Sequence, residues 1–144
     1  MAISSAICNS FKQEILVEGH NFTNGTDQFK LALYTSSASL GASTTAYSAT
    51  NEITNSSGSA YSAGGANLTS VTPVLDGSTA VCDFADISFT SASFTANGCL
   101  IYNSTNSNKA VCVVAFGGDK TVSSGTFTIQ FPAAGASTAI VRIA

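Results

Sequence analysis

The stretch from Phe94 to Phe116 reads FTANGCLIY, NSTNSNK and AVCVVAF in succession. Its outer parts are rich in apolar and β-branched residues, and its polar middle part, residues 103–109, has the composition of a hairpin loop. The pairs Leu100-Ile101 and Val113-Val114 are apolar on both faces of their strands. We therefore expect this hairpin to lie centrally in a sheet that is covered on both sides.

The cysteines of this hairpin raise the question of a disulfide. If the hairpin is symmetric about Thr105–Asn106, Cys99 lies opposite Cys112, whereas a slip of one residue sends them to opposite faces. Cys8 and Cys82 complete the set, and no CxxC pair occurs. With a single histidine, this spacing does not favour a zinc site. We expect buried thiols, as in a reducing cytosol, with disulfides as the alternative in an oxidising medium.

Strand signals continue on both sides of the hairpin. Phe29, Leu31 and Leu33 alternate with other residues and share one face, and Asp76-Gly77 predicts a tight hairpin turn. Pro73 indicates an edge strand or a strand end, and a break is expected at residues 117–119. The segments with strand character are 29–34, 67–74, 79–84, 86–89, 94–102, 110–116, 126–131 and 139–143. About eight short strands separated by turns predict an all-β fold, an antiparallel sandwich or barrel.

The N-terminal segment, residues 1–28, carries the one helix signal. Ser10 and Gln13 match a capping box, Phe11 and Ile15 begin an apolar stripe that Leu16 extends, and Gly19 predicts the C-terminal stop. A helix of about two turns does not stand alone in water, so we expect it to dock onto the sheet.

A long segment, residues 35–65, is rich in Ser, Thr, Ala and Gly. It is too long for a tight turn, and we interpret it as a functional loop or an arm that packs on a neighbour. Flexible disorder is the alternative. Tyr47, Ile53 and Tyr61 are spaced as anchors and argue against disorder.

The composition fits one domain spanning residues 1–144. Charged residues make up only 9% of the chain, which indicates extensive protein–protein contact unless hydroxyl and amide groups alone solvate the surface. The net charge of −3, without a basic patch, argues against nucleic-acid binding. No apolar run long enough for a transmembrane helix occurs. The start of the chain lacks signal-peptide character, so we expect folding at the site of synthesis.

Residues able to carry chemistry are few. His20 is the only histidine, no GxSxG elbow accompanies it, and we expect it to be a turn histidine bonded to backbone. Asp83 and Asp86 could be a glycosidase pair, but the chain has no tryptophan, and these residues equally suit a strand-end turn. Calcium binding by Asp83, Asp86 or Asp119 lacks the DxDxDG loop. We predict no catalytic residue, cofactor or metal.

The glycine pairs Gly64-Gly65 and Gly117-Gly118 do not belong to phosphate-binding loops, because neither pair leads into a helix. We interpret both as bulges or sharp bends.

An ordered set of segments carries a family resemblance: 12–22 (KQEILVEGHNF), 29–35 (FKLALYT), 61–68 (YSAGGANL), 94–103 (FTANGCLIYN), 115–119 (AFGGD) and 125–129 (GTFTI). Over nearly the whole chain this set resembles a group of small virion structural proteins of tailed bacteriophages. The resemblance implies membership of the virus particle and carries over no catalytic residue. The cysteines depart from the family pattern, in which small aliphatic residues are common.

The leading hypothesis is a capsid decoration, or cement, protein that binds the outer surface of the head, without enzymatic activity. The expected partners are the major capsid protein or other virion proteins and further copies of the chain, with a homotrimer favoured, and the expected location is the virion, assembled in the host cytoplasm. The alternatives are a neck, tail or fibre-associated structural protein and a host-surface carbohydrate-binding module presenting Tyr34, Tyr47, Tyr61 or Tyr102. The residues predicted to form the core are Phe94, Leu100, Ile101, Val113, Val114, Phe116, Phe127, Ile129 and Phe131.

Overall fold

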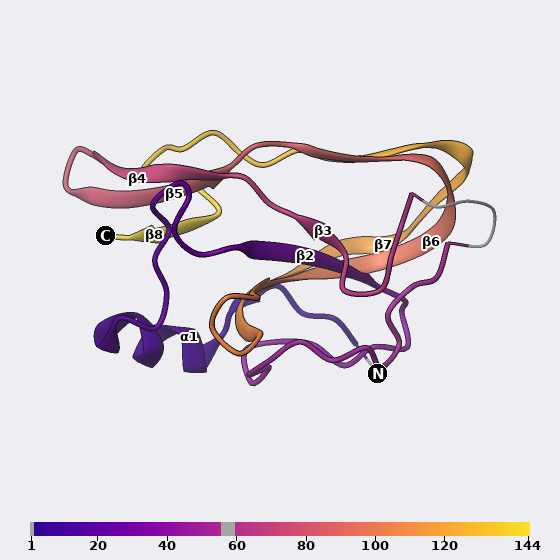
Figure 1. Ribbon diagram of the computed structural model, residues 1–144, viewed down its shortest axis with the longest axis horizontal. Coiled ribbons are helices and arrows are strands. Elements are labelled where there is room, and N and C mark those ends of the chain that lie inside the picture. The colour runs from indigo at the N-terminus through magenta and orange to yellow at the C-terminus, as the bar shows by residue number, and fades with distance from the viewer. Residues whose placement is uncertain (1, 56–59) are drawn as a thin grey trace.

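The computed structural model describes residues 2–55 and 60–144, which form two antiparallel sheets and one short helix (Figure 1). The larger sheet has the strand order β1-β7-β6-β2-β3, and the smaller has the order β4-β5-β8. The predicted all-β sandwich with a short N-terminal helix is confirmed. The elements are β1 (Ala6–Ile7), α1 (Asn9–Glu14), the 3-10 helix η1 (Ile15–Val17), β2 (Phe29–Tyr34), β3 (Ala66–Asn67), β4 (Ser70–Asp76), β5 (Thr79–Phe84), β6 (Ile87–Asn103), β7 (Lys109–Ile129) and β8 (Val141–Ile143).

The hairpin of β6 and β7 forms the frame of the fold. Residues 98–103 pair with residues 109–115 inside the larger sheet, as the sequence predicts for central strands. Residues 87–96 pair with residues 120–129 and form a two-stranded ribbon. In Figure 1 the two strands turn at the right-hand end and run back above β2. One long hairpin therefore supplies parts of two layers.

The bend in β7 lies at the predicted break, which proves to be inside a continuous strand. Pairing passes from Gly98↔Ala115 to Ala96↔Lys120, so residues 116–119 oppose Asn97 alone. Gly117 and Gly118 have φ values of +77° and +146°, which side chains rarely tolerate. The interpretation of this pair as a bulge is confirmed. Four predicted strands, residues 86–89, 94–102, 110–116 and 126–131, merge into two.

The helix is docked on the sheet as expected, but its ends differ from the prediction. Cys8 is the N-cap and makes no side-chain capping bond, while Ser10 lies inside the helix. The predicted capping box is wrong, because backbone groups from other parts of the fold bond the amides at this helix end. The Cys8 backbone amide donates to the Val111 carbonyl and the Asn9 backbone amide to the Ala42 carbonyl. At the other end Glu18, with φ of +59°, takes the left-handed position predicted for Gly19.

Residues 35–52 lie along the face of the larger sheet that is turned away from the ribbon (Figure 1). Tyr61, in contrast, contacts Phe89 and Phe94 of the ribbon, and residues 56–59 of the 35–65 segment lie outside the described part of the chain. The Ile53 amide donates to the Leu33 carbonyl, and Ile53 is buried. Tyr61 is also buried and Tyr47 is half-buried, so the predicted anchors pack on the sheet of their own chain. The described part of the segment is thus built into the fold.

The core is centred on β2, where Phe29, Leu31 and Leu33 are fully buried. Of the nine residues predicted as core, Phe94, Leu100, Ile101 and Val113 are buried, in agreement with the sequence analysis. The other five are only partly buried, which corrects the prediction: Val114, Phe116, Phe127, Ile129 and Phe131. Most of these five lie on or just after the ribbon half of β7, residues 120–129. Among the described strands, only β6 pairs with this half.

Candidate functional site

His20 lies in a buried polar network between the N-terminal segment and the β6–β7 loop. Its Nε2 lies 3.0 Å from Glu14 Oε1, and its Nδ1 lies 3.2 Å from the Asn103 amide nitrogen. Since an amide NH2 can only donate, Nδ1 accepts and Nε2 carries the proton toward Glu14. The expected turn histidine bonded to backbone is therefore corrected, because its partners are side chains. Both ring nitrogens are engaged and the side chain is fully buried, so the arrangement joins segments of the chain and presents no base to solvent.

Asn103 extends this network into the loop. Its side-chain nitrogen Nδ2 also donates to Asp27 at 2.7 Å, and its side-chain oxygen Oδ1 accepts hydrogen bonds from the backbone amides of Thr105 and Asn106. Asp27 accepts a hydrogen bond from the backbone amide of Asn21 at 2.9 Å. A buried network in which each group has a partner holds one geometry, and this one connects residues 20–27 to the hairpin end.

The aspartates singled out from the sequence each satisfy a local partner. Asp83 accepts the Phe84 amide, Asp86 accepts the Phe131 amide, and Asp119 accepts the side chain of Asn97. Asp83 is the penultimate residue of β5 and Asp86 directly precedes β6, so the interpretation as a strand-end turn is confirmed. Within residues 2–55 and 60–144, no three His, Cys, Asp or Glu side chains are grouped so that they could hold a metal ion.

A carboxylate–tyrosine cluster that the sequence analysis missed anchors the long loop. Glu52 accepts the hydroxyls of Tyr47 and Tyr61, each at 2.6 Å, and the Gly64 amide at 2.8 Å. Tyr102, stacked on Tyr47 with ring centroids 4.7 Å apart, donates to the Gly64 carbonyl. Hydrogen bonds to a carboxylate are about twice as strong as neutral ones, so Glu52 fixes several parts of the loop at once.

One sequence signal could have found this cluster. Glu52 is the only charged residue between Lys30 and Asp76, and a lone carboxylate in such a segment needs partners when the segment packs. The chain contains four tyrosines, and their hydroxyls were available as donors.

Replacing Glu52 by Gln should lower the free energy of unfolding by about 2–3 kcal/mol. The glutamine side chain carries no charge, and its NH2 group can only donate hydrogen bonds. Buried tyrosine hydroxyls that donate to Glu52 are therefore left without a good acceptor. Urea unfolding monitored by tyrosine fluorescence measures the change. Glu18→Gln, on an exposed residue, is the matched control and should stay within about 0.5 kcal/mol of wild type. Equal effects of the two variants would contradict the assignment.

The tyrosines offer no platform for a sugar ring. Tyr34, Tyr61 and Tyr102 are buried, and Tyr47 is half-buried with its hydroxyl bonded to Glu52. Sugar sites present exposed aromatic faces, whereas Tyr34 donates to the Ser48 carbonyl and the other three tyrosines belong to the Glu52 cluster.

The cysteines are free thiols, and the hairpin does not have the symmetric register that would place Cys99 opposite Cys112. Cys99 lies opposite Val114 and Cys112 lies opposite Ile101, because the pairing beside the loop is centred on Asn106 and a register irregularity between Ile101 and Tyr102 shifts it by one further residue. The two thiols are then diagonal neighbours, a placement too far apart for a disulfide without backbone movement. Burial raises the pKa of Cys99 to about 12 and that of Cys112 well above the ordinary value, so both resist ionisation and reaction.

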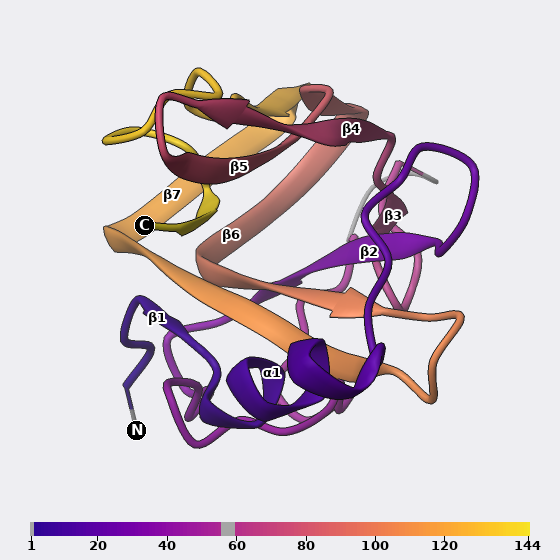
Figure 2. The ribbon, with the colours of Figure 1, turned by 90° about the vertical axis from the view of Figure 1, so that its left-hand side faces the viewer.

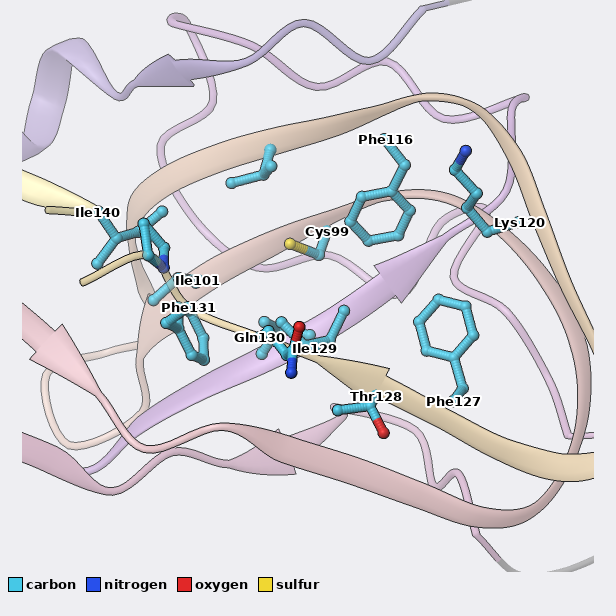
Figure 3. Close-up of a pocket in the computed structure, with 13 residues that line it drawn as sticks. Cys99, Ile101, Phe116, Lys120, Phe127, Thr128, Ile129, Gln130, Phe131 and Ile140 are labelled. Atoms are coloured by element: carbon cyan, nitrogen blue, oxygen red, sulfur yellow. The ribbon is translucent and has the colours of Figure 1, made fainter. Parts of the chain in front are cut away.

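An open apolar slot lies between the ribbon and the larger sheet (Figure 3), and it has a volume of about 340 Å³. Core residues such as Leu31 and Ile101 form its floor. Phe131 and Ile140 lie at one end and Lys120 lies toward the other. The half-buried residues predicted as core line this slot: Val114, Phe116, Phe127, Ile129 and Phe131. The core is thus left open along the ribbon half of β7.

A second apolar surface lies on the smaller sheet. Val74 and Leu75 are 59% and 71% exposed, and they belong to β4, one of the two edge strands of that sheet. Figure 2 shows β4 and β5 on the opposite side of the molecule from α1, with β6 and β7 passing between. Apolar side chains on an exposed edge strand are a recognised site of association.

Comparisons with known proteins identify no relative, since no protein-family model, curated protein or solved structure matches the chain. Over the described residues, no helix is both long and apolar enough to cross a membrane.

Proposed function

We propose that this chain is a structural protein of a tailed-bacteriophage virion, a capsid decoration protein that binds the outer surface of the head and stabilises the shell. The observation that carries the proposal is the pairing of a surface poor in charge with two unpartnered apolar features, the open slot and the edge of β4. A protein that stays free in solution covers or charges such features. The ordered sequence segments that resemble phage virion proteins direct the proposal to a virus particle.

The internal construction suits this role. The long loop is anchored to the sheet through Glu52, and the N-terminal segment is anchored through His20 and Asn103. A body whose described segments are anchored in this way loses little conformational entropy when it binds. Many copies on one lattice then gain avidity from modest individual contacts. Capsid lattices offer three-fold sites, so a closed homotrimer is the favoured free state.

The test is the stoichiometry of this chain relative to the major shell protein in purified particles. A copy number comparable with that of the shell protein is expected for a decoration protein. A number far below it would favour the second candidate, a neck, tail or fibre-associated structural protein. Binding of the purified chain to shells that lack it is the complementary measurement, and failure to bind would overturn the decoration role.

A host-surface carbohydrate-binding module is the candidate of another class. The burial of three of the four tyrosines gives it little support. Binding of the purified chain to a glycan array would restore it.

A further inference from the structure

We propose that the β4 edge of one copy of this chain inserts into the open slot of a second copy, so that copies associate head to tail. The slot is the unfinished part of the core. Residues 127–131 alternate between apolar and polar side chains, the pattern of a strand with one covered face, yet Phe127, Ile129 and Phe131 remain partly exposed at the slot. An additional apolar strand would complete the burial.

The strand edge beside the slot is also unpaired. On the side of β7 away from β6, the strand pairing within the described residues is made by β1 and reaches only Cys112 and Val113. The ribbon half, residues 120–129, has β6 alone as its strand partner in the described chain. An unpaired edge next to an apolar slot can accept both the backbone and the side chains of an added strand.

β4 has the form of the missing strand. Val74 and Leu75 point to opposite faces, as successive strand residues do, and both are exposed because β4 is an edge. In Figure 1 the β4–β5 hairpin projects at the left-hand end of the molecule. Its two apolar faces could contact the two walls of the slot. Backbone pairing would be limited to residues 74–76, because Pro73 has no amide hydrogen and the register is irregular between Val71 and Val74.

Charge complementarity selects a second copy as the occupant. Lys120 lines the slot, and the ion pairs among the described residues both involve Glu14, so Lys120 has no carboxylate partner there. Asp76 is the last residue of β4. It forms no ion pair with any described residue, although its carboxylate accepts a hydrogen bond from the Ala136 backbone amide. With Asp76 placed at the Lys120 end, the apolar side chains of β4 lie along the apolar part of the slot. The inserted strand and the slot are different surfaces, so the contact is heterologous and forms a ring if the rotation closes.

The experiment measures the mass of the full chain by light scattering and sedimentation over a concentration series. Wild type should form a defined oligomer, and Leu75→Glu should raise its dissociation constant at least about tenfold. Leu16→Glu is the matched control, since Leu16 is 83% exposed on η1 and belongs neither to the lining of the slot nor to β4. A wild-type monomer at all concentrations, or equal effects of the two variants, would overturn the proposal.

Two further measurements keep the proposal testable if one variant folds poorly. Lys120→Glu and Asp76→Lys should each weaken association, and the double variant should recover it. Leu75→Glu disables the inserting strand but keeps the slot, and Phe116→Glu disables the slot but keeps the strand. A mixture of the two can form one contact, so it should give a 1:1 dimer that grows no further. A mixture that stays monomeric would contradict a head-to-tail contact. Because shell binding is a separate measurement, a monomeric Leu75→Glu variant that still binds shells leaves the proposed function intact.

Discussion

Phe29→Ala should lower the free energy of unfolding by about 3–5 kcal/mol, the range for deleting a fully buried aromatic side chain. Phe29 is fully buried and stacks on Phe22, with ring centroids 4.3 Å apart and planes 8° from parallel. Its ring also lies 5.8 Å from Phe84 of the smaller sheet and 6.2 Å from His20. The substitution therefore opens a cavity where both sheets and the N-terminal segment meet.

Urea unfolding followed by circular dichroism measures this loss, with the midpoint shift compared at constant slope. Phe127→Ala is the matched control, because Phe127 is the same residue type but lines the open slot. Its ring already has open space on one side, so its removal should cost less than half as much as removal of Phe29. Equal losses would show that the slot is closed in solution. Repeating the comparison in dilute protein separates the effect of self-association.

The elements that could be predicted from the sequence are those set by local chemistry. The alternation at Phe29–Tyr34, the turn at Asp76-Gly77 and the polar loop at residues 103–109 each correspond to an observed strand or turn. Turn residues and period-two alternation act over a few positions, so a single sequence contains enough information for them. The interpretation of Gly117-Gly118 as a bulge succeeded for the same reason.

The core boundary could not be predicted in the same way. Phe127 and Phe131 alternate as buried residues do, but alternation shows which face of a strand is apolar and not whether another layer covers that face. The register at Cys99 was not predictable because the loop pairing is centred on Asn106 and an irregularity near Ile101 displaces every pair beyond it by one more residue. Both errors concern long-range geometry, which local patterns do not contain.

The Glu52 cluster was missed although its donors Tyr47, Tyr61 and Gly64 lie only 5 to 12 residues away, because the segment has no regular periodicity that would bring these groups together. Tyr102 lies 38 residues from Gly64, whose carbonyl it bonds, and no local spacing indicates that contact. The His20 network has the same character, since Asn103 is 83 residues away. Polar contacts of this kind depend on the completed fold, whereas a helix or a turn does not.

Alkaline pH should unfold this protein steeply, beginning near pH 9. Burial raises the pKa of the Cys8 thiol to about 11 and that of Cys99 to about 12, from an ordinary 9.0, and Cys112 shifts in the same direction. Burial and the nearby Glu52 carboxylate raise the pKa of Tyr102 to about 12. The remaining raised groups, also with burial as the main cause, are Tyr34, Tyr47, Tyr61 and Cys82.

The sign follows from proton binding in the two states. Above pH 9 the unfolded chain releases its thiol protons while the folded chain retains them, so the unfolded state binds fewer protons and stability falls as pH rises. Each such group contributes about 1.4 kcal/mol per pH unit between its two pKa values. Three buried thiols, Cys8, Cys99 and Cys112, then remove about 4 kcal/mol by pH 10, a large part of the stability of a small domain. The tyrosines add their share above pH 10.

Urea midpoints at pH 7, 9, 10 and 11, measured with a reducing agent present, test this expectation. The Cys99→Ala/Cys112→Val variant removes two of the thiols, so its loss between pH 7 and pH 10 should be smaller by about 2.7 kcal/mol. Absorbance at 295 nm reports tyrosine ionisation, which should accompany unfolding instead of preceding it. A stability that is constant up to pH 11, or an unchanged slope in the double variant, would show that these thiols ionise as freely in the folded protein as in the unfolded chain.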